Sequence, residues 1–247
     1  MDNNFNFNNN RSTNIEGTTV TVQKNLLATV FLWMFIGMVV TTIASLAFAF
    51  IPELFSLMVN VNAEGFITGK SVLGHIITFA PLLMLIGIGA GYSRFSFTAL
   101  AAFFVVFSAL FGISISYIFI IYQVGSIVNV FLSTCALFGL MAGVGYFTKT
   151  DLTKLGSILM IGLAGIFIAS LINYFVGSSQ AGYIISVIAV IIFTGLTAYD
   201  MQKIKNLIAE NDGSESFKKI ALMGALSLYL DFINLFLSLL RIFGGRK

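Results

Sequence analysis

The sequence predicts an all-α polytopic membrane protein with seven transmembrane helices. Of its 247 residues, 58% are apolar and 9% are charged, whereas a soluble domain carries about 25% charged residues. Most of the apolar residues fall into seven runs, each close to the roughly 20 residues with which a helix crosses a hydrocarbon layer about 30 Å thick. The runs cover about residues 26–51, 73–92, 96–117, 124–147, 153–175, 181–201 and 219–243.

The runs are predicted to be helices rather than strands. Backbone groups in lipid must be bonded within their own segment or in a closed barrel, and these runs show no alternation of period two. Two pairs of glycines, Gly87 with Gly91 and Gly139 with Gly143, have the spacing that lets neighbouring helices approach closely. We therefore expect a compact helical bundle.

The segment before the first run is Asn-rich. Residues 1–24 contain too little contiguous apolar surface to offset the entropy lost on folding, so we expect a disordered cytoplasmic tail before a membrane domain of residues 25–247. Ala47-Phe48-Ala49 resembles a signal-peptide cleavage site. The run at 26–51 is longer than the 7 to 15 apolar residues typical of a signal peptide, so it is predicted to be the first transmembrane helix.

The basic residues of the loops predict the orientation. If the N-terminus is cytoplasmic, seven lysines and arginines lie in inner loops and Lys70 lies in an outer one. Arg241, Arg246 and Lys247 would then lie outside after seven full crossings, which leaves open a last segment that re-enters the membrane. No basic cluster indicates a nucleic-acid partner. The seven inner residues are Arg94, Lys149, Lys154, Lys203, Lys205, Lys218 and Lys219.

Asp231 is an energetic anomaly in the middle of the last run. An ionised aspartate at the centre of a membrane helix costs about 2.5 to 3.5 kcal/mol. Asp231 belongs to a polar stripe, because polar residues follow one another at spacings of four, three, four and three and therefore share one helix face. A polar stripe cannot face lipid, so the last helix is expected at the centre, enclosed by the other six. The stripe consists of Ser227, Asp231, Asn234, Ser238 and Arg241.

A second aspartate, Asp200, stands at the inner end of the sixth run, one helical turn after Thr197. On spacing alone, Asp200 can be an interfacial carboxylate in water, and Asp231 can be a structural carboxylate bonded to neighbouring serine or asparagine. Arg94 can equally be an anchor in an inner loop. These alternatives stay open at the level of residue spacing.

The segments Thr197-Ala-Tyr-Asp200-Met-Gln and Ala225-Leu-Ser-Leu-Tyr-Leu-Asp231-Phe-Ile-Asn-Leu-Phe resemble the two signature segments of the Bax inhibitor-1 (transmembrane Bax-inhibitor-motif) family, and the layout is similar over residues 25–244. The resemblance implies a central seventh helix between two three-helix layers. It also implies a proton-sharing pair of Asp200 and Asp231 near the cytoplasmic side, with Arg94 as a latch. Members of the family are described as pH-sensitive calcium leak channels, and one bacterial branch binds and restrains a membrane-embedded protease.

The chemistry of two buried carboxylates supports this implication. Two carboxyl groups in contact inside a low-dielectric interior cannot both ionise cheaply, so they would share a proton. Their oxygens, once ionised, suit calcium. Our leading hypothesis is a pH-sensitive calcium leak channel of the bacterial inner membrane, with Asp200 and Asp231 as sensor and ion contact and Arg94 as latch. Ser227, Asn234 and Ser238 would support the pair. The alternative is a regulatory protein that restrains a membrane protease.

Enzymatic and cofactor-binding functions are not expected. Intramembrane aspartyl proteases carry a Gly-x-Gly-Asp segment, which Leu-Tyr-Leu-Asp231 lacks, and no lysine inside the last run could hold retinal. The single Cys135 excludes an intrachain disulfide, and the single His75 has no carboxylate or thiolate company for a metal site. The segment at 65–71 resembles a phosphate-binding loop, but its spacing is one residue short and no strand is predicted before it.

Overall fold

The computed structural model describes residues 9–62, 66–209 and 215–247, and the side chains of the first helix from Leu26 onward. Within this part of the chain, seven helices are long and apolar enough to cross a membrane, as the sequence predicts. They are α1 (Asn9–Phe50), α3 (Val72–Gly91), α4 (Phe97–Ile115) with its short continuation α5 (Ile118–Ile121), α6 (Val124–Phe147), α7 (Thr153–Val176), α8 (Ser179–Ala209) and α9 (Glu215–Phe243).

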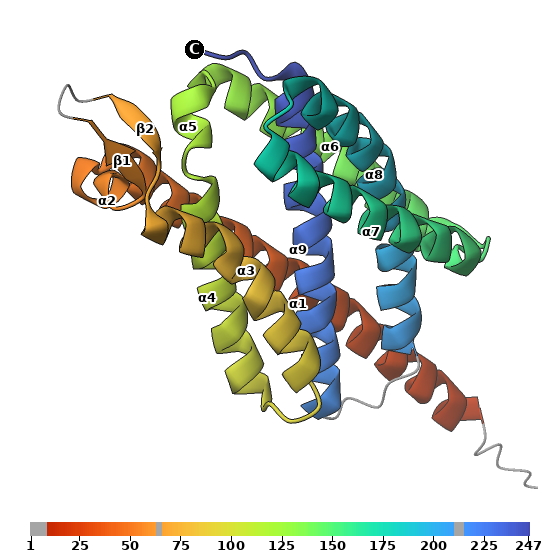
Figure 1. Cartoon of the computed structure of the whole chain (residues 1–247). Coiled ribbons are helices and arrows are strands. Elements are labelled where there is room, and N and C mark those ends of the chain that lie inside the picture. Colours follow the sequence, from red (N-terminus) through yellow and green to blue (C-terminus); the bar gives the residue numbers. More distant parts are fainter. Residues whose placement is uncertain (1–8, 63–65, 210–214) are drawn as a thin grey trace, which may run out of the picture.

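The last helix, α9, lies at the centre of the bundle, as its polar stripe predicts (Figure 1). It is the most buried of the seven spans and packs on α1, α4, α6 and α8. By contrast, α3 packs mainly on α4, and α7 packs mainly on α8. The enclosure of α9 is therefore made chiefly by four of the six other spans. The two remaining spans are apolar on all sides, so a position facing lipid satisfies them equally well.

Tyr229 holds α9 against α1 and α4. Its side chain is fully buried, and its hydroxyl lies 2.6 Å from Thr41 Oγ1, which in turn donates to the carbonyl of Ser108 at 3.0 Å. The rings of Phe104 and Phe107 meet the Tyr229 ring edge-on. The hydroxyls of Tyr229 and Thr41 are therefore both hydrogen-bonded, and burying them in the core leaves neither without a partner.

The glycines that bring helices together are not the ones that the sequence predicts. A Cβ atom at Gly87, Gly139 or Gly143 would meet nothing within 4 Å, and one at Gly91 would meet the ring of Phe95 in the turn after α3 rather than another helix, so these residues do not mark contact faces. The close approaches occur at Gly112, which lies against the backbone of Thr41, and at Gly145, which lies against the backbone of Ala198. Spacing alone does not reveal which face of a membrane helix meets a neighbour, and this explains the wrong prediction.

A small extramembrane unit joins α1 to α3. It consists of α2 (Pro52–Ser56) and an antiparallel pair of strands, β1 (Val59–Val61) and β2 (Ile67–Lys70). Ser71 caps α3, since its hydroxyl accepts the N–H of Gly74 at 2.9 Å. The described part of the segment that resembles a phosphate-binding loop is thus the strand β2 followed by the cap of α3. Contrary to expectation, a strand, β1, precedes this segment.

The structure describes parts of both ends of the chain. It assigns α1 from Asn9 onward, and residues 1–8 lie outside the described residues, so the disordered tail over residues 1–24 stays a prediction. A helix seeded in the apolar run propagates at low cost into adjoining residues, and none of residues 9–24 is a proline. At the other end, α9 continues to Phe243 and does not turn back, so the re-entrant alternative is wrong.

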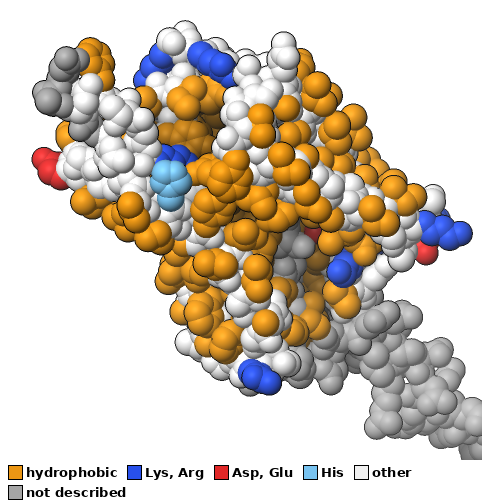
Figure 2. Space-filling model, viewed as in Figure 1, with side chains coloured by type: hydrophobic (Ala, Val, Ile, Leu, Met, Phe, Trp, Pro, Cys, Tyr) orange, Lys and Arg blue, Asp and Glu red, His pale blue; other side chains and the backbone are white. Residues whose placement is uncertain are grey.

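The outer surface of the bundle is largely apolar (Figure 2). Large side chains on α7 and α8 are exposed, including Ile161, Phe175 and Ile191, whose exposed fractions are 75%, 77% and 66%. In a bilayer this surface meets lipid tails rather than water, so its exposure carries no penalty. Figure 2 also shows a hollow in the middle of this face, with an acidic side chain visible inside it.

Candidate functional site

The packing of α8 against α9 brings Asp200 and Asp231 together. A side-chain hydrogen bond joins the two carboxyl groups. Asp231 is buried, with 4% of its surface exposed, and Asp200 is partly buried at the edge of the same contact. The two residues are 31 positions apart in the chain, and no helix spacing alone could have placed them in contact.

A hydrogen bond between two carboxyl groups requires a proton on one of them, because an ionised carboxylate only accepts. The Ser227 hydroxyl donates to Asp200, and the charge of Lys203 acts on Asp200 from one turn further along α8. Within the described part of the chain, no N–H or hydroxyl donates to Asp231 Oδ2, which is buried. The two carboxyl groups of the pair therefore have different surroundings.

Side chains around Asp200 fix the inner end of α8. Gln202 is buried and bonds the turn between α6 and α7 on both sides, since its Oε1 accepts the N–H of Leu152 at 2.8 Å and its Nε2 donates to the carbonyl of Thr150 at 2.8 Å. Lys205 donates to the carbonyl of Tyr146 at 2.7 Å. These bonds fix the segment of α8 that carries Asp200 to α6 and to the turn before α7. The distance between Asp200 and Asp231 therefore depends on how α9 packs against α8.

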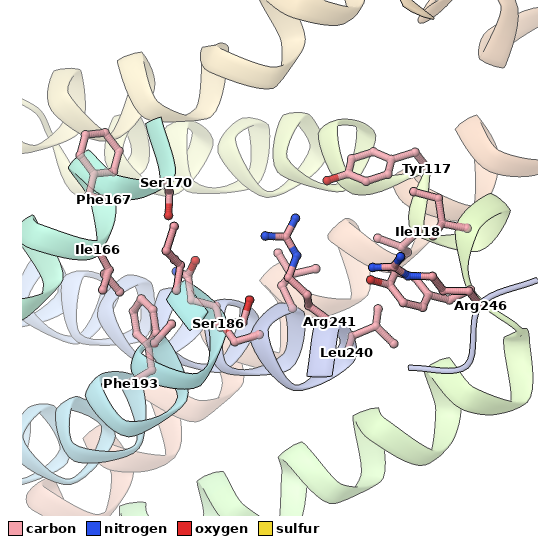
Figure 3. Close-up of a pocket in the computed structure, with 17 residues that line it drawn as sticks. Tyr117, Ile118, Ile166, Phe167, Ser170, Ser186, Phe193, Leu240, Arg241 and Arg246 are labelled. Atoms are coloured by element: carbon pink, nitrogen blue, oxygen red, sulfur yellow. The ribbon is translucent and has the colours of Figure 1, made fainter. Parts of the chain in front are cut away.

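The polar stripe of α9 divides into two parts. Ser227 belongs to the aspartate pair. Asn234 and Ser238 do not: Asn234 Nδ2 donates to the carbonyl of Leu230 at 2.8 Å, and Ser238 Oγ donates to the carbonyl of Asn234 at 2.7 Å. Both residues line a cavity of about 570 Å³ at the opposite end of the bundle, which also contains Arg241 (Figure 3). The expected support for the pair is therefore limited to Ser227.

Arg94 is not brought to the pair in this structure. It lies exposed in the turn between α3 and α4, and in the described residues no hydrogen bond or ion pair joins it to Asp200 or Asp231. The cation that acts on Asp200 is instead Lys203, whose Nζ lies 5.9 Å from the centre of the Tyr199 ring. The spacing of three residues between Asp200 and Lys203 places both on one helix face, and this is the sequence feature that indicates their interaction.

The pair does not make a complete calcium site by itself. Calcium takes six to eight oxygen ligands, and two carboxylates supply at most four. In the described residues, no group of three or more histidines, cysteines, aspartates or glutamates lies close enough to hold a metal ion. Asp200 and Asp231 can contact a passing ion that keeps part of its water, but they are not built to retain one.

The chain matches the family model described as "Inhibitor of apoptosis-promoting Bax1" over residues 23–247. The chain belongs to the Bax inhibitor-1 family. Among its relatives, the inner membrane protein YbhL of Escherichia coli K12 is 39% identical over 223 residues, which cover 90% of this chain and 92% of YbhL. A Borreliella burgdorferi protein is 39% identical over 233 residues, covering 94% and 97% of the two chains. A Rickettsia prowazekii protein is 39% identical over 220 residues, or 88% of each chain.

Membership of the Bax inhibitor-1 family confirms the resemblance that the two aspartate segments carry. The seven apolar helices and the YbhL relatives also confirm an integral protein of the bacterial inner membrane. The roles of Asp200, Asp231 and Arg94 stay predictions at this point, because family and fold do not by themselves assign a function to a side chain.

Proposed function

We propose that the chain is a pH-sensitive leak channel for cations, calcium in particular, and that the Asp200–Asp231 pair gates it. The observation that supports the proposal is the hydrogen bond between two carboxyl groups at the junction of α8 and the central helix α9. Intramembrane carboxyl groups are costly, and in membrane proteins they commonly mark ion paths and proton relays.

The gate would work through the charge of the pair. With one shared proton, the pair carries a single negative charge and ties α8 to α9. Release of that proton leaves two like charges about 4 Å apart, whose repulsion is about 4 kcal/mol at an effective dielectric constant of 20. About 4 kcal/mol changes the ratio of two packings by about 10³-fold, whereas a full change from 1:99 to 99:1 requires about 10⁴-fold, or about 5.5 kcal/mol.

The neighbours of the pair suggest how the second packing is reached. Because α3 packs mainly on α4, its inner end, where Arg94 lies, is held by few other contacts. Movement of this end toward α8 would place a guanidinium beside the ionised pair and compensate its second charge. Arg94 is therefore proposed as a latch that engages only after the proton leaves.

The proposal is tested by calcium entry into liposomes that contain the purified protein, measured with an internal calcium-sensitive dye between about pH 5 and 8. We expect flux through the wild type to change with pH, and flux through Asp231→Asn and Asp200→Asn to lose that dependence. Asp151→Asn is the matched control, because Asp151 is an exposed carboxylate in the turn before α7. Flux that is unchanged by both pair variants over the whole range would sink the proposal.

A second candidate function is supported by α7. This span packs mainly on α8 and buries the smallest share of its residues of the seven. Such a face suits a helix of another membrane protein as well as it suits lipid, which fits a regulator that binds and restrains a membrane protease. Co-purification after deletion of residues 1–24, and after substitution of exposed Ile161 by tryptophan, tests it. Loss of a partner with intact calcium flux would indicate two separate roles.

A further inference from the structure

The end of the bundle opposite the aspartate pair holds a cavity that the proposed function does not use. It has a volume of about 570 Å³, within the range of small-ligand sites. A second cavity of about 420 Å³ adjoins it, since Arg241, Arg246, Ser170 and Ile185 line both. The other polar residues that line the larger cavity are Tyr117, Tyr122, Ser186, Asn234 and Ser238.

Two guanidinium groups face these cavities, and among the described residues no aspartate or glutamate lines either cavity. Arg241 closes the last turn of α9, and Arg246 comes from the C-terminal segment that follows it. Asp231, the acid of α9 nearest to Arg241 in the sequence, is ten residues away, which is about 15 Å along the helix. Two cations in one cavity without an acid repel each other, and an anion between them removes the repulsion.

The contacts of Arg241 leave its donors available. Within the described residues, the guanidinium makes one hydrogen bond, from Nη1 to the carbonyl of Gly182 at 3.3 Å. Figure 3 shows the guanidinium directed away from α9, toward the hydroxyl end of Tyr117. Gly182 leaves the room for this arrangement, because a Cβ there would lie 2.6 Å from Arg241 Nη1 and 3.2 Å from Asn173 Nδ2. Two side chains with N–H donors therefore converge over Gly182.

The surroundings of the cavities add positive potential. Ser178 and Ser179, at the start of α8, line the smaller cavity, so the positive end of the helix dipole of α8 is directed at it. Lys70 of β2 lies 5.2 Å from the ring centre of Tyr117 and 5.7 Å from that of Tyr174, two tyrosines that line the cavities. Partial burial lowers the pKa of Lys70 below its ordinary value, so an anion nearby would also favour its charged form.

The basic residues at this end also contradict the usual charge bias. With a cytoplasmic N-terminus, Arg241 and Arg246 lie on the outer side, where the bias disfavours lysine and arginine. The C-terminal segment is nevertheless fixed there, since the N–H of Gly245 donates to Ser126 Oγ at 2.7 Å and the N–H of Gln123 donates to the carbonyl of Gly245 at 2.9 Å. A ligand that binds both arginines would explain why they are held at the outer end of the bundle.

We propose that the cavity between α5, α7, α8 and α9 binds a phosphate group through Arg241 and Arg246. Guanidinium groups match the oxygens of a phosphate in paired hydrogen bonds. The remaining wall is apolar, with Ile166, Phe167 and Leu237, so the ligand is expected to carry an apolar part next to the phosphate. The phosphate can belong to an anionic lipid of the outer leaflet or to a soluble phosphate ester. This site is independent of whether the chain conducts ions.

The test is calorimetric titration of the purified full chain in detergent with three probes: short-chain phosphatidylglycerol, short-chain phosphatidylcholine and inorganic phosphate. We expect phosphatidylglycerol to bind with one-to-one stoichiometry, and affinity to fall about tenfold or more in Arg241→Gln or Arg246→Gln, since a hydrogen bond to a charged group contributes about 1.5 to 3 kcal/mol. Arg94→Gln, an exposed arginine at the opposite end, is the matched control and should bind as the wild type does.

The three probes separate the two sources of the phosphate. Binding of phosphatidylglycerol without inorganic phosphate indicates a lipid headgroup, and binding of both indicates a site for soluble phosphate compounds as well. Arg246→Gln is the safer variant for folding, because Arg246 lies beyond the end of α9, and circular dichroism checks both proteins. No binding of any probe, or equal binding by the wild type and both arginine variants, would overturn the proposal.

Discussion

Replacement of Asp231 by asparagine removes the proposed shared proton but keeps the hydrogen bond between α8 and α9. Asparagine has nearly the same shape, and its Nδ2 can donate to Asp200 at every pH, so α8 and α9 stay joined. We propose that the folded pair of the wild type holds a proton that the unfolded chain releases at neutral pH, in which case stability falls as the pH rises. The charge repulsion that appears on release is about 4 kcal/mol for two charges about 4 Å apart at an effective dielectric constant of 20.

The assay is the midpoint of thermal unfolding in detergent, between about pH 6 and 9. Each kcal/mol shifts the midpoint of a chain of this size by about 2 to 4 °C, so the wild type is expected to lose roughly 10 °C over the range in which the pair ionises. Asp231→Asn should lose almost nothing, and Asp151→Asn, whose substitution is outside the pair, should follow the wild type. Parallel curves for the wild type and Asp231→Asn would refute the shared proton.

Three further predictions concern a buried hydroxyl, a glycine contact between helices and an exposed carboxylate. Tyr229→Phe removes the hydroxyl that bonds to α1 and should cost about 1 kcal/mol in the free energy of unfolding, measured by denaturant titration. Gly145→Ala places a Cβ against the α8 backbone and should cost about 1 to 3 kcal/mol, whereas Gly143→Ala, which has open space, should be near neutral in the same titration. For Asp151, bonds from the Thr153 hydroxyl and N–H lower the pKa from its ordinary value of 3.8. Its stabilisation is therefore fully present above pH 3.8, and the difference between the wild type and Asp151→Ala should shrink as the solution is acidified below that pH.

The sequence predicts the central helix because an intramembrane acid leaves few alternatives. A polar stripe on an apolar helix cannot face lipid, so the position of α9 follows from the energetics of Asp231 alone. The contact between Asp231 and Asp200 required the family resemblance, because residues on different helices can meet in many ways. No property of Asp200 by itself distinguishes a buried partner from an interfacial carboxylate.

Other features could not be predicted because their signals are ambiguous in lipid. An apolar helix is compatible with both protein and lipid surroundings, so the sequence does not reveal which face of α3 or α7 meets protein. For this reason it could not show that only four spans are main neighbours of α9. Gly145 and Gly143 differ only in which face they present, and only one of them meets another helix. The strands β1 and β2 are too short for a clear alternation.

The two arginines that line the cavity at the outer end belong to separate features of the sequence. Arg241 was predicted as the end of the polar stripe, and Arg246 as part of the basic C-terminus. Their convergence on one cavity depends on the path of the chain after Phe243, where the C-terminal segment pairs with Tyr122. Neither helical periodicity nor the charge bias describes such a short non-helical segment.

Infrared difference spectroscopy of the protein in bilayers, recorded as the pH is raised from neutral, tests the shared proton most directly. A protonated carboxyl group has a carbonyl band separate from that of a carboxylate, and few acids of this chain lie inside the membrane spans. A shared proton on the pair predicts such a band at neutral pH in the wild type and in Asp151→Asn, its loss at high pH, and its absence in Asp231→Asn. A wild-type spectrum without a protonated carboxyl band at neutral pH would contradict the pair as described.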